Sequence, residues 1–528
     1  MTRETRPLGA QISHMLKDRG VEVIFGVPGV HNQEMYRGIE EAGLRHVLSR
    51  HEQGAGFMAD GYARATGKTG VCYVISGPGL CNIMTPMGQA YSDSVSMLVI
   101  SSCLDETSAT RGQLHQMRDQ EGAARTVCDW SETARTADAA YHLIDRALGE
   151  FETGRARPKH LTVPIKALEG QAPQGWSADR TLPANLNTPV EGALRLFAEA
   201  LGAARRPVFI LGGGAAAAAE AIRPVLKKAQ AASFVTYAGR GIVNDDPLHF
   251  GALLARGDSA EVLASADLLI SVGTDLSEVD LWRTKTGATC RHIRINIDGE
   301  ILARRSGEDV SIACDAGLFF ASLAPFVAEG NTDWTAAEVS QFTARMRAQI
   351  DAERPGIGRV ADALRAAIPA DTMIYSDMTQ FAYAAKEIWP MDRPGHWHHP
   401  YGFGTLGYAL PAAIGGAVAR PGQPTMAIAG DYGFQYTIQE LGTAVELGLP
   451  LPIILWDNGK LGEIEAGMIR AQIAPNAVVQ RNPDFCKLAE AYGARAEQPA
   501  DLAALADAVQ RAFTAEVPTL IRVTPDIG

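Results

Sequence analysis

The chain has 528 residues, of which 46% are hydrophobic and 20% charged, and its formal net charge is −12. Single hydrophobic cores stop growing near roughly 250–300 residues, so this length predicts several domains. The acidic balance argues against a nucleic-acid partner, which would need clustered Lys and Arg, and no apolar stretch reaches the roughly 18 residues of a membrane helix.

From the N-terminus onward, short β-branched runs alternate with helical patterns. The first eight residues hold no apolar run of signal-peptide length, so we expect a cytoplasmic protein. The predicted strands cover residues 21–25, 70–75, 97–101, 207–211, 268–272, 292–297, 372–375, 425–429 and 450–456. Such alternation is typical of parallel sheets joined by crossover helices. The fold class is therefore α/β.

Two stretches without this alternation, 167–188 and 326–356, are interpreted as linkers. They divide the chain into three doubly wound parallel-sheet domains, which we place at residues 1–168, 186–328 and 356–528. In the middle domain, Gly212 to Gly214 follow a predicted strand and precede a helix. These glycines would suit a phosphate at a helix N-terminus, or simply close packing of strand and helix.

The third domain carries the most informative pattern. The strand at 425–429 leads into Gly430-Asp431-Tyr432-Gly433, and a predicted helix at 436–447 leads to the next strand and Asn458. Parallel sheets bind ligands at the carboxyl ends of their strands, where Asp431 and Asn458 would converge. A carboxylate and an amide oxygen suit Mg²⁺, and glycines let the backbone approach a pyrophosphate. Taken singly, such residues are often only helix caps.

Gly430-Asp431 followed by Asn458 resembles the thiamine-diphosphate fingerprint shared by acetolactate synthases and 2-oxo acid decarboxylases. The likeness extends over nearly the whole chain. The other matching segments are 25–29, 50–55, 59–64, 76–79 with Asn82, and 402–411. The resemblance implies that the three domains are, in order, a pyrimidine-binding, a central and a diphosphate-binding domain.

The resemblance also implies a role for each matching residue. Glu52 would hydrogen-bond the aminopyrimidine of thiamine diphosphate and promote removal of the thiazolium C2 proton. Leu406 would push the thiazolium toward the pyrimidine, and the Gly404 carbonyl would hold the 4′-amino group. Asp431, Asn458 and Lys460 would hold Mg²⁺ at the diphosphate. The remaining implied cofactor contacts are Pro28, Pro78, Asn82, Thr379, Gln380, Gly430, Tyr432, Gly433 and Leu461.

Members of this family build each site between two subunits, with the glutamate from one chain and the metal ligands from the other. The resemblance therefore implies a homodimer at least, and a homotetramer as the expected assembly. The substrate implied is a small 2-oxo acid.

Two differences from the acetolactate synthases bear on which activity of this family to expect. Acetolactate synthases have a Gly-Gln pair near the position of Cys103 and a lysine further on, whereas this chain has no lysine between Lys68 and Lys159. We therefore doubt both acetolactate synthase activity and the FAD that those enzymes carry.

A closer resemblance is to 5-guanidino-2-oxopentanoate (2-ketoarginine) decarboxylases, through segments 29–31, 50–64, 111–115, 119–120 and 462–464. His115 or Gln116 would handle protons at the substrate carbonyl, unless His115 is only a loop residue. Glu463 would bind a guanidinium, although it could instead pair with Arg470 or donate a proton.

The leading prediction is a thiamine-diphosphate-dependent decarboxylase of a 2-oxo acid with a guanidino or other polar tail. A carboligase that transfers the resulting carbanion to an acceptor shares every cofactor residue. A non-catalytic sensor on the same fold is the third hypothesis.

Overall fold

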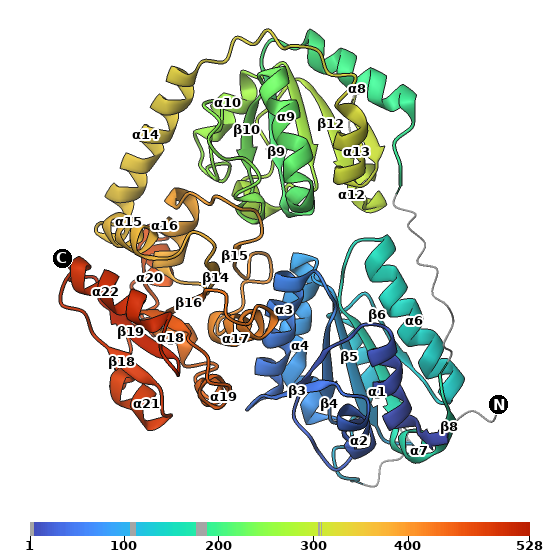
Figure 1. The fold of residues 1–528 in the computed structure, drawn as a ribbon. Coiled ribbons are helices and arrows are strands. Elements are labelled where there is room, and N and C mark those ends of the chain that lie inside the picture. The colour runs from blue at the N-terminus through green and yellow to red at the C-terminus, as the bar shows by residue number, and fades with distance from the viewer. Residues whose placement is uncertain (1–4, 106–111, 176–186, 305–306, 308, 528) are drawn as a thin grey trace. The chain divides into compact units, whose positions relative to one another are not determined.

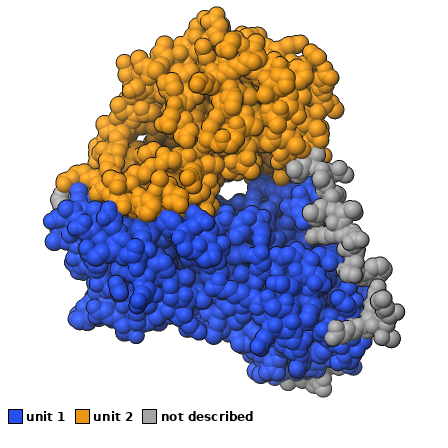
Figure 2. All heavy atoms as spheres, in the orientation of Figure 1, with its two compact units in different colours: residues 1–183, 374–379, 399–528 blue, residues 184–373, 380–398 orange. Residues whose placement is uncertain are grey.

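In the computed structural model, residues 5–105, 112–175, 187–304, 307 and 309–527 are described. Arg111 of the motif at 111–115 and half of the predicted linker at 167–188 lie outside these ranges. The chain forms two compact units (Figure 2). Unit 1 comprises residues 1–183, 374–379 and 399–528, and unit 2 comprises residues 184–373 and 380–398.

Unit 1 contains an N-terminal parallel sheet with strand order β3-β2-β4-β5-β7-β6 (Figure 1). The strands are β2 (Val23–Gly26), β3 (Arg45–Leu48), β4 (Gly70–Val74), β5 (Met97–Cys103), β6 (Trp130–Thr133) and β7 (Lys159–Pro164). The helices of this part of the chain are α1 (Leu8–Asp18), α2 (Gln33–Glu41), α3 (Glu52–Thr66), α4 (Pro78–Asp93), α5 (Gln120–Arg125), α6 (Ala137–Thr153) and α7 (Ile165–Glu169). A small antiparallel pair joins β1 (Thr5–Pro7) to β8 (Gln171–Pro173). The strand order reverses between β2 and β4, where such sheets bind ligands.

The C-terminal sheet of unit 1 has the order β14-β16-β17-β19-β18. Its strands are β14 (Met373–Ser376), β16 (Thr425–Gly430), β17 (Pro452–Trp456), β18 (Arg495–Glu497) and β19 (Thr519–Val523). Its helices are α17 (Ala409–Ala419), α18 (Asp431–Phe434), α19 (Glu440–Glu446), α20 (Gly462–Arg470), α21 (Phe485–Ala491) and α22 (Leu502–Ala512). Strands β16, β17, β19 and β18 run parallel.

Helices α3 and α17 join the two sheets of unit 1 (Figure 1). They approach so closely that a Cβ on Gly61 would lie 2.0 Å from the Ala412 carbonyl oxygen, and one on Gly415 would lie 1.9 Å from that of Met58. Only glycine permits such backbone contact. The contact fixes the helix that begins at Glu52.

Unit 2 contains a parallel sheet with the order β10-β9-β11-β12-β13. The strands are β9 (Pro207–Leu211), β10 (Ala232–Val235), β11 (Leu268–Val272), β12 (Arg291–Asn296) and β13 (Val310–Ala313), with β15 (Trp397–His398) elsewhere in the unit. The helices are α8 (Glu191–Ala203), η1 (Gly213–Ala218), α9 (Ala219–Ala229), η2 (Tyr237–Gly239), α10 (Ser259–Ala264), α11 (Glu278–Leu281), α12 (Gly299–Ala303), α13 (Ala316–Leu323), α14 (Ala336–Glu353), α15 (Ile357–Ala367) and α16 (Gln380–Ile388). Together with the two sheets of unit 1, this sheet confirms the prediction of three parallel-sheet α/β domains.

Two predicted elements are wrong. The stretch 326–356 is mostly helix α14, because Val339, Phe342, Met346 and Ile350 recur at helical spacing and are buried. The helix predicted at 436–447 begins only at Glu440, since the chain turns first through the short helix α18. Among the described residues, no helix is long and apolar enough to cross a membrane.

Candidate active site

Strands β16 and β17 are parallel neighbours, with Gly430 opposite Trp456, so their carboxyl ends lie side by side. Asp431 begins α18 directly after β16, and Asn458 follows β17 by two residues. The Gly459 N–H donates to Asp431 Oδ2 over 2.9 Å, which ties the two strand ends together. The predicted convergence of Asp431 and Asn458 at one sheet edge therefore agrees with the geometry.

The carboxylate of Asp431 is buried and well supplied with donors. The Tyr432 N–H donates to Oδ1 (3.0 Å), and the Asn482 side-chain amide donates to Oδ2 (2.6 Å). Asn482 also donates to Asp457 Oδ1 over 2.7 Å. Asn482 was missed in the sequence, because it lies on a loop with no characteristic spacing from either aspartate.

Burial raises the pKa of Asp431, and the nearby Asp457 carboxylate raises it further, while the bond from Asn482 opposes both effects. Asp457 Oδ2 pairs with the Arg522 guanidinium over 2.7 Å, so Asp431 is the carboxylate at this edge whose charge a bound cation would balance. The Asn458 Oδ1 atom lies on the same edge and accepts a weak bond from the Lys460 N–H at 3.3 Å. This set of hard oxygen atoms fits Mg²⁺.

Glu52 lies at the first position of α3 and is buried. Its Oε2 accepts a 2.9 Å hydrogen bond from the Asn82 side-chain amide on α4. A Cβ on Gly79 would lie 3.3 Å from Glu52 Oε1, so the turn that contains Pro78 passes close to the carboxylate. The predicted residues Glu52, Pro78 and Asn82 are thus brought together.

Pro28 follows β2, at the same sheet edge as the turn after β4. The two loops touch, because a Cβ on Gly29 would lie 2.2 Å from Ile75 Cδ1. Pro28 therefore lies at the point where the strand order reverses, as expected for a ligand site.

His115 is held at the same edge. Its φ is +59°, and a Cβ on Gly77 would lie 2.5 Å from its carbonyl oxygen. Its ring meets that of His31 edge-on with centroids 5.0 Å apart, and His31 Nδ1 lies 3.1 Å from Ser76 Oγ. His115 Nδ1 is buried and has no hydrogen-bond partner in the described parts of the chain.

Two residues near His115 are His31, which contacts its ring, and Gln116, which follows it in the chain. Burial lowers the pKa of His31, and the neighbouring His115 lowers it further, so the His31 ring favours the neutral form near pH 7. The Gln116 Oε1 atom accepts a hydrogen bond from the Gln113 N–H over 3.1 Å. In the sequence, His31 lies within the matching segment 29–31 and was assigned no role.

The segment of Gly404 and Leu406 is anchored from two sides. The Thr405 N–H and Oγ1 both contact Gln89 Oε1, at 3.3 and 3.0 Å, and the Gly407 N–H donates to Asp377 Oδ2 at 2.8 Å. Gly404 has φ +67°, which favours glycine, and Leu406 is half-buried.

Asp377 was missed in the sequence, since no motif marks it. Burial raises its pKa to about 6, against the effect of several backbone N–H donors. Its Oδ2 would lie 2.8 Å from a Cβ on Gly433, and a Cβ on Gly430 would lie 3.1 Å from Thr379 Cβ. Thr379, Gly430 and Gly433 therefore lie together, whereas Gln380 begins α16 in unit 2.

Helix α20 begins four residues after Asn458. The Leu461 N–H donates to the Val478 carbonyl (2.8 Å), and Lys460 Nζ pairs with Glu465 Oε2 (2.6 Å). Glu463 is partly exposed in the first turn, and Arg470 is exposed in the last. Seven residues correspond to a rise of about 10 Å, so an intrahelical pair between Glu463 and Arg470 is disfavoured.

The two clusters of unit 1 remain distinct in the described chain. None of the residues that hydrogen-bond Glu52 is also a partner of Asp431. The Glu52 cluster lies at the N-terminal sheet and the Asp431 cluster at the C-terminal sheet, and we refer to them as the two half-sites.

In unit 2, the Gly212 to Gly214 loop lies where β9 and β11 end. A Cβ on Gly212 would lie 2.3 Å from the Gly273 carbonyl oxygen, and one on Gly214 would lie 3.1 Å from Gly273 Cα. These glycines serve close backbone packing, which supports the second of the two interpretations of this loop.

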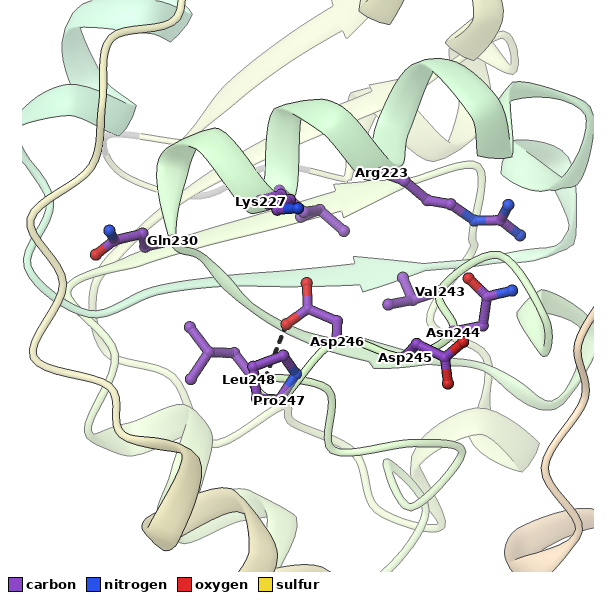
Figure 3. A pocket seen from close by; sticks show the side chains of 10 residues that line it. Arg223, Lys227, Gln230, Val243, Asn244, Asp245, Asp246, Pro247 and Leu248 are labelled. Carbon is purple, nitrogen blue, oxygen red and sulfur yellow. Dashed lines mark hydrogen bonds between the residues drawn. The ribbon is translucent and has the colours of Figure 1, made fainter.

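A hollow in unit 2 lies between α9 and the loop after η2 (Figure 3). The Arg223 guanidinium donates to the carbonyls of Gly241 (2.9 Å) and Ile242 (2.8 Å), so it holds that loop in place. None of the predicted site residues lines this hollow.

Three domain families match the chain in order. They are described as thiamine pyrophosphate enzyme N-terminal TPP binding domain (residues 6–123), central domain (194–323) and C-terminal TPP binding domain (377–523). The chain is 40% identical to a "Probable 2-ketoarginine decarboxylase AruI" of Pseudomonas aeruginosa, over 99% of this chain and 94% of the relative. It is 29% identical to acetolactate synthase isozyme 2 large subunit of Escherichia coli, over 98% of this chain and 95% of the relative. It is 31% identical to an acetolactate synthase of Mycobacterium avium, over 92% of this chain and 82% of the relative.

Proposed function

Because the chain belongs to the thiamine pyrophosphate enzyme family, we propose that it decarboxylates a 2-oxo acid with a guanidino tail, using thiamine diphosphate and Mg²⁺. The observation that carries this proposal is the 40% identity with the probable 2-ketoarginine decarboxylase over 99% of the chain. The acetolactate synthases are more distant, at 28–31% identity.

In this reaction the bond between C1 and C2 of the 2-oxo acid breaks and CO₂ leaves. A proton then replaces it on C2, so that 5-guanidino-2-oxopentanoate would yield 4-guanidinobutanal. When bound, thiamine diphosphate would supply a nucleophilic carbon for the substrate carbonyl and a positively charged thiazolium ring that takes up the electron pair of the broken bond.

Glu52 would hold the aminopyrimidine ring through its carboxylate, which Asn82 keeps oriented over 2.9 Å. A positioned carboxylate in a buried place can exchange a proton with the ring nitrogen. Gly404 and Leu406 would orient the cofactor, helped by the contacts of the flanking Thr405 and Gly407.

Asp431, Asn458 and the carbonyl of Lys460 would bind Mg²⁺, with the diphosphate against Gly430 and Gly433. The remaining contacts to the diphosphate end would come from Thr379, Gln380, Tyr432 and Leu461. The buried Asp431 carboxylate accepts hydrogen bonds from the Tyr432 and Gly459 N–H groups and the Asn482 amide, all of them uncharged, which supports a cation at this place.

His115 and Gln116 would handle protons at the substrate carbonyl and at C2. The unpartnered buried Nδ1 of His115 supports this role, because it is able to donate or accept there. Glu463 would bind the guanidinium of the substrate, since an acid in the first turn of α20 lies close to the metal loop along the chain.

The two separate half-sites support an assembly of at least two chains, with a homotetramer as the proposed form. Glu52 of one chain would face Asp431 of another. We also propose that the enzyme is cytoplasmic.

Purified protein with thiamine diphosphate and Mg²⁺ tests the proposal on 5-guanidino-2-oxopentanoate, 2-oxohexanoate and pyruvate. We expect CO₂ release at least ten times more efficient, by kcat/KM, for the guanidino acid than for pyruvate, and acetolactate as a minor product only. Acetolactate as the main product would favour the carboligase, and no turnover of any 2-oxo acid would favour the sensor.

A further inference from the structure

Helix α19 contacts the segment that leads from β3 into α3, immediately before Glu52. Three of its side chains, Glu440, Thr443 and Glu446, stand at i, i+3 and i+6 and all contact this segment. Such spacing places them along one face of the helix.

Glu440 makes the central contact. The Arg50 N–H donates to both carboxylate oxygens, at 3.1 and 3.0 Å, and the His51 N–H also bonds this carboxylate. Thr443 Oγ1 lies 3.0 Å from Glu440 Oε2 and 3.2 Å from the Leu48 carbonyl. The Glu446 carboxylate pairs with the Arg50 guanidinium at 2.5 Å.

The fit around Glu440 is close. A Cβ on Gly54 would lie 2.2 Å from Glu440 Oε1, so a larger residue at that position of α3 would displace the carboxylate. The side chain of His51 caps α3 by accepting from the Gln53 N–H, and Glu440 binds the two N–H groups directly before the helix. A helix N-terminus also attracts negative charge, which favours a carboxylate at this place.

Burying a carboxylate at this place costs free energy of folding. A purely structural role is therefore a poor explanation for Glu440. Glu440 is fully buried, and burial raises its pKa to about 7, although the donors from Arg50, His51 and Thr443 and the charge of Arg50 oppose the rise. A neutral side chain at this position would avoid the cost of burying a charge.

Glu440 lies nine residues after Asp431, and the segment it holds ends at Glu52. We propose that Glu440 is a positioning residue for Glu52: it fixes the first turn of α3 and thereby aims the Glu52 carboxylate. This inference rests on the proposed proton-handling role of Glu52. It adds a residue that touches neither cofactor nor substrate.

Four variants test the inference: Glu440→Gln, Glu446→Gln as a control on the same helix, Glu52→Gln, and the double variant Glu440→Gln/Glu52→Gln. The glutamine amide would place a donor against the N–H groups of Arg50 and His51. Hydrogen–deuterium exchange of the protein without cofactor should therefore rise about tenfold at residues 50–53 in Glu440→Gln and stay within twofold of wild type in α20. Glu446→Gln should leave both regions, and kcat, within twofold, because its pair with Arg50 is exposed.

Steady-state kinetics on the preferred 2-oxo acid gives the second readout. Glu440→Gln should lower kcat about 10- to 100-fold with KM changed less than threefold, and the double variant should be no slower than Glu52→Gln alone. Losses that multiply in the double variant, or unchanged exchange at residues 50–53, would overturn the positioning role. If Glu440→Gln does not fold, Thr443→Val replaces it, with a kcat loss of about 3- to 10-fold and the same dependence on Glu52.

The two proposals fail in different ways. A Glu52→Gln enzyme with the wild-type rate would refute the proposed role of Glu52 itself. A slow Glu52→Gln enzyme combined with multiplied losses would refute only the positioning role of Glu440.

Discussion

Replacing Glu463 by glutamine removes one negative charge from the first turn of α20 and keeps the size of the side chain. If Glu463 binds the guanidinium of the substrate, the variant loses a charge-assisted hydrogen bond worth about 1.5–3 kcal/mol, which corresponds to roughly 10- to 150-fold in kcat/KM. Because Glu463 is partly exposed, solvent screening favours the lower end, about tenfold.

The assay compares kcat/KM for 5-guanidino-2-oxopentanoate with that for the uncharged 2-oxohexanoate. The control is Glu465→Gln, which removes a charge from the same helix, where Glu465 pairs with Lys460 over 2.6 Å. We expect Glu463→Gln to lose about tenfold with the guanidino acid and less than threefold with 2-oxohexanoate. We expect Glu465→Gln to change both substrates by the same factor.

The reasoning would be refuted if Glu463→Gln lowered kcat/KM equally for both substrates. Glu463 would then serve the chemistry common to all 2-oxo acids. An unchanged kcat/KM for both would mean that the cationic tail binds elsewhere.

Three further predictions concern the two half-sites and the core. Asp431→Ala should abolish Mg²⁺-dependent binding of thiamine diphosphate in a titration of metal-stripped protein, since it removes the anionic ligand; unchanged affinity would contradict the assignment. Glu52→Gln should retain cofactor binding but slow exchange of the C2 proton, followed by NMR, about 10²- to 10⁴-fold; wild-type exchange would make Glu52 structural. Burial lowers the pKa of His160 from 6.5 to about 3, so its contribution to stability is present above pH 6.5 and is lost as pH falls toward 3, by about 1.4 kcal/mol per unit. His160→Asn should flatten the fall in Tm between pH 6 and pH 4, and an unchanged slope would show that other groups dominate.

The strands were predictable because they are short apolar runs, rich in β-branched residues, that alternate with helical patterns. The strands predicted at 97–101 and 425–429, for example, correspond to β5 and β16. Helix α14 was missed because polar residues separate its buried positions, so that the stretch looked like a linker. Three domains followed from the same alternation, whereas their boundaries stay a prediction.

In the candidate site, the sequence predicted the residues that lie in motifs directly after strands. It did not predict the residues whose hydrogen-bond partners lie far away along the chain. Asp431 and Asn458 each follow a strand that can be predicted from the sequence, and these two strands are neighbours in the sheet. Asn482 and Asp377 act through contacts with distant segments, and neither lies at a characteristic spacing from its partners. Glu440 is similar, because its partner Arg50 is 390 residues away.

The most direct test of the account is the carbon balance of the reaction with 5-guanidino-2-oxopentanoate, thiamine diphosphate and Mg²⁺. Mass spectrometry of the products, together with measured CO₂, should find one 4-guanidinobutanal for each CO₂ released, and neither product when the cofactor is left out. CO₂ released with a condensed carbon–carbon product in place of the aldehyde would contradict the decarboxylase and support a carboligase.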